Sequence, residues 1–470
     1  MYYKHGKKSK DNILINMKQK KKIVFSLFYF SSFFSLAEAQ SLQQLYDLAD
    51  QHNQQITVSQ TGLRAASEAV MVAKNAMLPN VELSASGSYI GDATLMSRGF
   101  STSGTTSVIL AGLGPQKVEN GRQKSPHWGN SFTAQVSQVI YAGGAIRAGI
   151  RISELGEQMA TLDVEKNRQE VRFLITGYYL DLYKLKNQQM VIDQNIMLTK
   201  KVIQNMEARC NQGTVLKNDI TRYELQLMTL QLTKEKLKDA QNIINHQLCT
   251  TLHLADGSTI AIDTLMINRE MKSMNAIVNE HNWQQKAYEN NIGIQQANVA
   301  SQLAEQKIKT TRAESLPSLA VIAEDNLFGP YTNDLIPVNA NVNAWFVGIG
   351  LKYNLGSLWK NTHSVRHAQL NYKQTQEQIA LAREGVENSI QAGYVNFLTS
   401  FKEVETQQKQ VELATQNYDV VQNRYQNQLA LLTDMLDASS MKLSADMALV
   451  NARISLLYNY YKLKYISNTL

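Results

Sequence analysis

The chain has 470 residues, of which 44% are hydrophobic and 19% are charged, and this composition excludes a globally disordered protein. The net charge of +7 is typical of nucleic-acid binding, but it is concentrated in residues 1–39, where eight Lys and two acids give a net of +6. Because only +1 remains for the rest of the chain, we expect no nucleic-acid partner.

The first 39 residues have the pattern of a secretory signal peptide. A lysine cluster ends at Lys22, an apolar run follows from Ile23 to Leu36, and Ala37-Glu38-Ala39 has the small-x-small pattern of a cleavage site. The apolar run is too short for a transmembrane anchor, and Met17 is a second candidate start. We therefore expect a mature chain that begins near Gln40, and the absence of Cys at this site argues against a lipid anchor.

The prolines fall in two clusters, which separate segments that can form long helices from segments that cannot. The first cluster contains Pro79, Pro115 and Pro126, and the second contains Pro317, Pro330 and Pro337. Because proline breaks the interior of a helix, long helices are permitted between Pro126 and Pro317 and from Val338 onward.

Two β-hairpins are predicted, one in each proline-containing region. Apolar and polar residues alternate after Leu78-Pro79 and after Leu316-Pro317, and a second alternating run follows each of these segments. The predicted strands are about 80–90 and 131–141 in the first copy, and about 318–328 and 344–355 in the second. A long Gly- and Ser-rich loop, 91–130, connects the first pair, and its sequence indicates no ligand.

Long helices are predicted after the hairpins. The segment from Ala145 to Arg209 would span about 100 Å as a helix, so it needs a packing partner along its length. Apolar residues recur at intervals of seven, which predicts supercoiled helix packing. The clearest row contains Ile390, Phe397, Val404, Val411, Tyr418 and Tyr425. The same order of elements occurs twice, which predicts repeats at 40–253 and 274–470 with a connector at 254–273.

The turn between the long helices has the same pattern in both copies. Its shared positions are Arg209, Gly213 and Asp219 in the first copy, and Arg424, Gln428 and Asp434 in the second. Only the second copy adds a further acid, Asp437. Cys210 lies beside the first turn and Cys249 about 50 Å along the return helix, so we expect no disulfide between them.

A four-stranded sheet that enters a membrane needs partners for its two edges, because unpaired backbone groups cost several kcal/mol each in hydrocarbon. Strands of about ten residues with one apolar face suit an outer-membrane barrel. Together with the Leu-Pro hairpin entries, the duplication and the Arg-x-x-x-Gly turn followed by Asp, this pattern resembles the TolC family of outer-membrane channel proteins across essentially the whole mature chain.

The resemblance implies an α+β fold. Long antiparallel coiled-coil helices would form a trimeric α-barrel, and the two β-hairpins of each chain would contribute to a 12-stranded transmembrane β-barrel. It also implies a homotrimer in outer-membrane lipid with a long periplasmic extension, which docks onto a periplasmic adaptor protein and an inner-membrane pump. The connector and the C-terminal residues would form a band around the middle of the helices. No cofactor and no enzymatic activity are implied.

The same resemblance assigns a gate to the turns. Tyr425 would pair with Asp219 to latch the closed periplasmic end, and Ala430 takes the place of an Arg that would pair with the residue at Asn218. Two simpler interpretations stay open. Tyr425 also closes its seven-residue row and could be a packing residue, and Asp219 could serve the helix dipole.

Two further groups of residues correspond to family sites. Asp434 and Asp437 match the acids of the pore constriction, where six carboxylates of a trimer would attract cations, although acids are also common in a first helical turn. The turn residues Gly213 and Thr214 and their counterparts Gln428 and Leu429 match the contact surface for the adaptor. Gln428 replaces a usual glycine, and a side chain there resists a positive φ, so docking at that turn is a weaker expectation.

The most favoured function is the outer-membrane duct of a tripartite efflux system. The alternatives are the duct of a type I protein secretion system and, in a different class, a coiled-coil adhesin on the cell surface. An enzyme is disfavoured, since His363 and His367 have metal-ligand spacing but no third ligand is evident, and no metal site is predicted. The sequence does not specify the exported substrate.

Overall fold

The computed structural model describes residues 40–470 except 92, 95–106, 111–113, 118–121, 124–126, 256, 275–279, 334–335 and 339. The predicted signal peptide and much of the 91–130 loop lie outside the described residues. Two compact units are present. Unit 1 contains the described residues up to Ser59 with Val164–Ile292 and Arg383–Leu470, and unit 2 contains Gln60–Asp163 and Gly293–Ala382. Each unit therefore draws on both predicted repeats.

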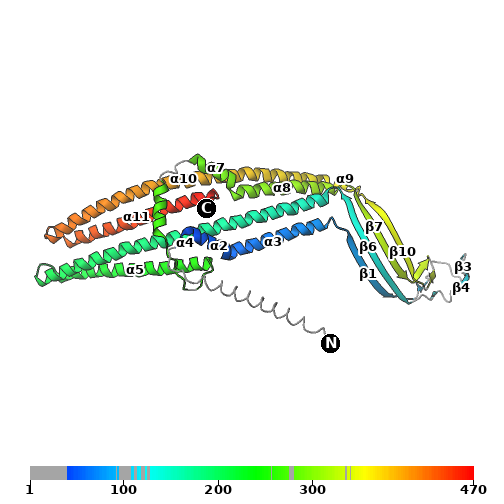
Figure 1. Ribbon diagram of the computed structural model, residues 1–470, viewed down its shortest axis with the longest axis horizontal. Coiled ribbons are helices and arrows are strands. Elements are labelled where there is room, and N and C mark those ends of the chain that lie inside the picture. The colour runs from blue at the N-terminus through cyan, green and yellow to red at the C-terminus, as the bar shows by residue number, and fades with distance from the viewer. Residues whose placement is uncertain are drawn as a thin grey trace, which may run out of the picture. The chain divides into compact units, whose positions relative to one another are not determined.

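Unit 2 contains a four-stranded antiparallel sheet in the order β1-β6-β7-β10 (Figure 1). Its strands are β1 (Asn80–Tyr89), β6 (Trp128–Ala142), β7 (Ser318–Gly329) and β10 (Val342–Lys352). The hairpin of the first repeat pairs with the hairpin of the second through β6 and β7. This arrangement confirms the predicted fold class of long helices with two β-hairpins. Short paired strands extend the loops: β2 (Ala93–Thr94) with β5 (Arg122–Gln123), β3 (Ser107–Leu110) with β4 (Gly114–Lys117), and β8 (Tyr331–Asn333) with β9 (Ile336–Val338).

The two faces of this sheet differ in polarity. Residues directly opposite each other share a face, and one row across all four strands consists of Val81, Val136, Ala323 and Val347. A row on the other face consists of Ser84, Thr133, Asn326 and Ala344, and its first three members are polar. There Asn326 accepts hydrogen bonds from the hydroxyls of Ser131 and Thr133, at 3.4 and 3.2 Å. The sheet is therefore apolar on one side and hydrogen-bonding on the other.

The helices are long where the sequence lacks proline. They are α2 (Leu42–His52), α3 (Gln54–Asn75), α4 (Ala145–Asn211), α5 (Lys217–Thr251), α6 (Thr264–Ser273), α7 (Glu280–Asn290), α8 (Ile292–Ala313), α9 (Ser357–Lys360), α10 (Thr362–Gln426) and α11 (Leu432–Ile466). Gly143 and Gly144, with φ of 61° and 86°, turn the chain between β6 and α4. Among the described residues, no helix has the length and apolar character needed to cross a membrane.

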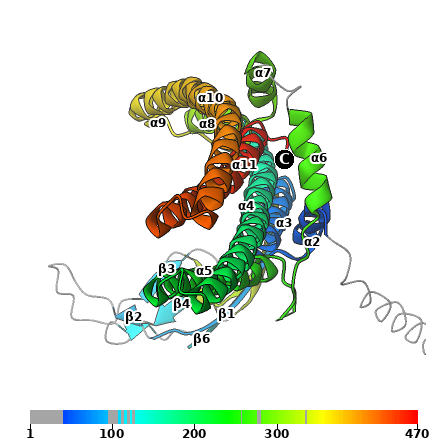
Figure 2. The ribbon, with the colours of Figure 1, turned by 90° about the vertical axis from the view of Figure 1, so that its left-hand side faces the viewer.

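In unit 1, α4 pairs with α5 and α10 pairs with α11, and Figure 2 shows both hairpins from the end at which they turn. The predicted seven-residue row forms much of their contact, since Ile390 and Phe397 are fully buried and Tyr418 is 5% exposed. One apolar core joins these helices to the connector. It includes Ile262 and Ile267 of the connector and Leu457 and Leu463 of α11. A second, smaller core lies near the turns.

Candidate functional site

The two helix-to-helix turns of unit 1 have the same backbone conformation. Gly213 and Gln428 occupy equivalent positions with φ of 73° and 62°. In both turns the residue after this position donates its N–H to the carbonyl of the arginine five residues earlier: Thr214 to Arg209 at 3.0 Å, and Leu429 to Arg424 at 2.8 Å. This hydrogen bonding is that of a Schellman motif.

Gln428 therefore adopts a positive φ although its side chain disfavours that conformation, and adaptor docking at this turn stays a prediction. Its backbone is held in the left-handed region by the turn hydrogen bonds, and the Arg424 guanidinium adds another by donating to the Leu429 carbonyl at 3.3 Å. The φ of a non-glycine residue in this region costs roughly 1 to 2 kcal/mol, so the turn overrides the local preference of the residue. Gly213, Thr214, Gln428 and Leu429 are all exposed at the surface of the protomer.

The acids that follow the turns lie at the starts of α5 and α11. The Asp434 carboxylate accepts a hydrogen bond from the Leu431 N–H at 3.0 Å, so it caps the first turn of α11. Asp437 lies one turn further along the same helix, and both acids are exposed in the protomer. Two carboxylates on one exposed helical face can attract cations whether or not they line a pore.

Tyr425 lies close to two charged groups of the neighbouring hairpin. The Arg209 guanidinium carbon is 5.8 Å from the centroid of the Tyr425 ring. Burial raises the pKa of the Tyr425 phenol, the Asp219 carboxylate raises it further, and the Arg209 charge lowers it. No hydrogen bond joins Tyr425 to Asp219 within the described protomer, and Asn218 is exposed. The latch between Tyr425 and Asp219 stays a prediction.

A tyrosine at the centre of the same region has an unpaired hydroxyl. Tyr223 of α5 is 1% exposed, packs in the small core with Tyr418 and Met435, and its hydroxyl has no hydrogen-bond partner among the described residues. Burial raises the pKa of its phenol above the ordinary range. A buried hydroxyl without a partner costs free energy, so the packing of the two hairpins at this point is less favourable than its apolar contacts alone would make it.

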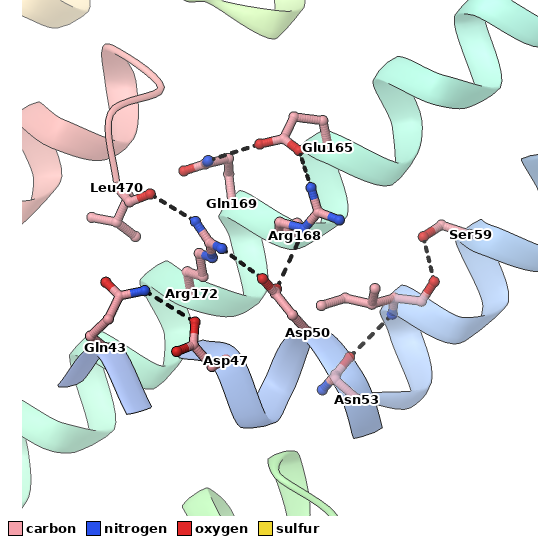
Figure 3. Close-up of polar contacts among 11 residues, drawn as sticks. Gln43, Asp47, Asp50, Asn53, Ser59, Glu165, Arg168, Gln169, Arg172 and Leu470 are labelled. Carbon is pink, nitrogen blue, oxygen red and sulfur yellow. Dashed lines mark hydrogen bonds and ion pairs between the residues drawn. The ribbon is translucent and has the colours of Figure 1, made fainter. Parts of the chain in front are cut away.

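A charged network surrounds Asp50 of α2 in unit 1 (Figure 3). The Arg172 guanidinium of α4 donates to the Asp50 carboxylate at 2.6 Å, and the Arg168 side chain lies 3.5 Å from it. Arg172 also donates to the backbone carbonyl of Leu470 at 3.0 Å. This network, the Asp50 clasp, joins α2 and the backbone of Leu470 to the same face of α4.

The connector is attached to α11 by a second polar group. The Glu270 carboxylate accepts a hydrogen bond from the Tyr461 hydroxyl at 2.6 Å, and the Lys464 ammonium lies 3.8 Å from it. The hydroxyl of Tyr179 donates to the Gln40 carbonyl and accepts from the Asp263 N–H, both at 3.0 Å. The connector is therefore hydrogen-bonded to α4 through Asp263 and to α11 through Glu270.

Comparison with known proteins identifies the family. The model of the family described as outer membrane efflux protein matches residues 45–252 and 283–469, which together make up most of the chain. The chain belongs to the outer membrane efflux protein family. The two matched segments lie within the predicted repeats, whose limits stay a prediction.

Relatives and solved structures agree with this assignment. The outer membrane protein TolC of Salmonella enteritidis is 21% identical over 450 residues, which cover 94% of this chain and 84% of that protein. The crystal structure of the outer membrane protein VceC of Vibrio cholerae matches with a TM-score of 0.69 at 15% identity, over 91% of this chain and 95% of that one. The CmeC outer membrane channel of Campylobacter jejuni matches with a TM-score of 0.68 at 16% identity, over 92% and 86%.

This efflux protein is accordingly a non-enzymatic outer-membrane channel with long periplasmic helices, as its sequence predicted. The family therefore favours the channel over the adhesin and the enzyme. His363 and His367 are exposed on α10, and the described residues contain no group of three or more His, Cys, Asp or Glu that could hold a metal ion. Cys210, next to the end of α4, and Cys249, near the end of α5, are both free thiols.

Sequence reasoning about the efflux protein missed Arg209 as a partner of Tyr425, and it missed the unpaired hydroxyl of Tyr223. The seven-residue rows identify which residues face into a helical hairpin, but they do not show which residues of one hairpin meet the other. Arg209 directly precedes Cys210, which is the counterpart of Tyr425 in the first repeat. That equivalence is the signal from which a contact between the two turns could have been inferred.

Proposed function

We propose that the chain forms a homotrimer in which three copies of the sheet close one 12-stranded barrel in the outer membrane. We further propose that this trimer is the exit duct of a tripartite efflux system, which receives substrate from a periplasmic adaptor and an inner-membrane pump. The observation that carries the trimer is the open-edged sheet with one apolar face. The duct of a type I secretion system is the alternative.

The edges of the sheet argue for closure by further copies. Within the described residues, β1 and β10 each pair with one strand only. The apolar side chains on these edge strands are largely exposed in the protomer, with 79% for Leu83, 72% for Ile349 and 70% for Leu351. An open edge leaves backbone groups unpaired in hydrocarbon, whereas pairing β10 of one copy with β1 of the next satisfies them and directs the apolar face toward lipid.

The turns of the helical hairpins are proposed as the gate and the docking surface. Asp434 and Asp437 would form the constriction, with Tyr425, Asp219 and Asn218 holding the closed state. The carboxylates of Asp434 and Asp437 from three copies would meet around the axis of a trimer, where these negative charges attract cations and repel anions.

The adaptor would contact Gly213, Thr214, Gln428 and Leu429. Exposed leucines beside both turns support this docking surface, with exposed fractions of 71% for Leu216, 67% for Leu429 and 69% for Leu431. Apolar side chains exposed together are typical of protein interaction sites.

Disulfide trapping tests the barrel. In a variant without Cys210 and Cys249, one cysteine in β1 is combined in turn with single cysteines along β10. If the barrel closes as proposed, one register gives a covalent trimer that runs at three chain masses on denaturing gels. The control pair joins β1 to β7, which are not adjacent in the sheet, and should give no such product. A chain that stays monomeric in detergent and in every register would overturn the trimer.

Crosslinking in cells tests the partners. A photoreactive residue at Leu429 should capture a periplasmic adaptor, and the same residue at the exposed position Lys409 of α10 serves as a control. Capture of an adaptor that works with a proton-driven pump supports the efflux duct. Capture only of one encoded with a secreted protein and an ATP-driven exporter supports the type I alternative.

A further inference from the structure

A polar groove lies in unit 2 beside the sheet, between the C-terminal end of α8 and the start of α10. Its volume is about 520 Å³, and its lining includes Arg312, Ser315, Leu358, Asn361, Val365 and Arg366. Arg312 is less than two helical turns before β7, and Leu358 belongs to the short helix α9 that follows β10. The groove is thus placed next to the ends of two strands.

The groove is positively charged without internal compensation. Among the described residues, Arg312 and Arg366 are the only charged ones that line it. Neither guanidinium forms an ion pair with an acidic side chain of the described residues, while several other cations of the chain do so. Guanidinium groups bind the oxygens of carboxylates and phosphates in a bidentate manner, so this lining is suited to an anionic group.

The floor of the groove is fixed by Asn361. This side chain is 6% exposed, and its amide donates to the Thr311 carbonyl at 2.6 Å and to the Ser315 hydroxyl at 2.8 Å. These bonds hold the end of α8 against the start of α10. The two arginines therefore project from elements whose spacing is set before any ligand binds.

The surroundings of the groove indicate a lipid rather than a soluble anion. Leu358 lines the groove and is 52% exposed, and Leu355 and Trp359, which are within three residues of it in the chain, are 58% and 66% exposed. Tryptophan is enriched at the interface between a membrane and water. Because the neighbouring sheet ends here, a lipid could place its phosphate in the groove and its acyl chains along these side chains.

A similar groove between α3 and α4 differs in its charge. It is lined by Arg64, Lys74 and Arg151, but also by Glu154 and Glu157. The Arg151 guanidinium lies 3.1 Å from the Glu154 carboxylate. Its cations have acids beside them, so it offers a matched control within the same unit.

We propose that the groove formed by Arg312, Asn361 and Arg366 binds the phosphate of an anionic phospholipid in the periplasmic leaflet of the outer membrane. Arg312 and Arg366 bind the phosphate oxygens, and Leu358 and Trp359 contact the acyl chains. This lipid site rests on the proposed insertion of the sheet into the membrane, with the ends of β7 and β10 at the periplasmic surface.

Native mass spectrometry of the full-length channel in detergent tests the site. Phosphatidylglycerol is titrated against the wild type, an Arg312→Gln/Arg366→Gln variant and the control Lys74→Gln/Arg151→Gln. We expect the first variant to bind phosphatidylglycerol at least about tenfold more weakly, as the loss of charge-assisted bonds predicts, and the control to bind as the wild type does. Equal binding by all three proteins would overturn the proposal.

Two further arms make the outcome decisive. Inorganic phosphate at millimolar concentration should not displace the lipid; displacement would show an anion site without lipid specificity and would overturn the proposal. A photoreactive phosphatidylglycerol should label wild-type peptides within 311–369, and labelling confined to other segments also overturns it, even if the Gln variant fails to assemble. Single-channel conductance of the wild type tests the barrel separately: a wild type that conducts but binds no phosphatidylglycerol overturns the lipid site alone, whereas a wild type that does not conduct counts against the proposed barrel.

Discussion

The guanidinium of Arg209 in α4 lies over the ring of Tyr425 in α10, with its central carbon 5.8 Å from the ring centroid. This contact joins the two helical hairpins beside their turns, and the Asp219 carboxylate acts on the same phenol. Tyr425 can therefore hold the hairpins together through its ring, through its hydroxyl, or through both, and these contributions can be separated by substitution.

If the hydroxyl of Tyr425 is a latch, Tyr425→Phe and Asp219→Asn should each favour the open channel by about 1 kcal/mol per copy. The double variant should open no more than either single one, because both remove the same bond. Planar-bilayer recordings of the fraction of time in the open state measure this. The ring contact is tested by Arg209→Gln, which should destabilise the closed state relative to the open state by about 0.5 to 1 kcal/mol.

If only Arg209→Gln opens the channel, Tyr425 holds the closed state through its ring and not through its hydroxyl.

Tyr223→Phe should stabilise the protein. It removes a buried hydroxyl that has no partner among the described residues and keeps the ring in the small core, so we expect a gain of about 1 kcal/mol in the free energy of unfolding. The matched control is Tyr179→Phe, which removes a hydroxyl with two hydrogen bonds and should destabilise by a similar amount. Thermal unfolding in detergent measures both. A loss of stability in Tyr223→Phe would show that its hydroxyl is paired in the assembled channel.

Alkaline pH should destabilise unit 1 through its buried tyrosines. Burial raises the pKa of Tyr179 from 10.0 to about 12, and it raises those of Tyr46 and Tyr461 further. Below pH 10 the phenols are protonated in both the folded and the unfolded chain, so their contribution to the free energy of unfolding is fully present. Above pH 10 the unfolded chain loses protons that the folded chain keeps, so the free energy of unfolding falls by up to about 1.4 kcal/mol per pH unit for each tyrosine.

The measurement is the denaturant midpoint between pH 8 and 11.5. Tyr46→Phe removes one of these phenols. The fall of the denaturant midpoint above pH 10 should therefore become less steep, by the share that one titrating phenol contributes. A decline of the same slope in the variant would mean that other groups dominate.

The Asp50 clasp should contribute measurably to stability. Asp50→Asn leaves the guanidinium groups of Arg168 and Arg172 without their carboxylate partner, and the loss of a charge-assisted bond predicts a destabilisation of about 2 kcal/mol. The control is Asp47→Asn on the same helix. Asp47 is exposed and accepts a hydrogen bond only from the neighbouring Gln43 among the contacts drawn in Figure 3, so its change should stay within about 0.5 kcal/mol. Equal effects in urea unfolding would contradict a specific role for the clasp.

The sequence predicts the elements of this fold well because their signals are periodic. Alternation after Leu78-Pro79 and Leu316-Pro317 identifies the hairpins, and the row of sevens through Ile390 and Phe397 identifies residues that are fully buried. Gly143 marks the start of a long helix because a positive φ is needed at that point.

Contacts between elements distant in the sequence were less accessible. Asp50 and Arg172 pair across more than a hundred residues, and no local pattern specifies such a pair. At Gln428 a local rule fails in another way. The preference of a glutamine predicts a negative φ, but the hydrogen bonds of the turn impose a positive one. Local rules therefore determined the helices and strands, while the polar contacts of the candidate site depend on the tertiary packing.

The two acids of α11 should control ion selectivity, and they can be neutralised without loss of the helix cap. Asp434 accepts the Leu431 N–H at 3.0 Å, and Asn retains an acceptor oxygen at that position, so Asp434→Asn/Asp437→Asn changes charge rather than structure. If both acids line the constriction, the variant should lose most of its preference for cations over anions in planar bilayers under a salt gradient. Asp239→Asn, on the exposed surface of α5, carries the same charge change away from the turn and should leave selectivity unchanged. Unchanged selectivity in the double variant would place Asp434 and Asp437 outside the pore and leave Asp434 as a helix cap alone.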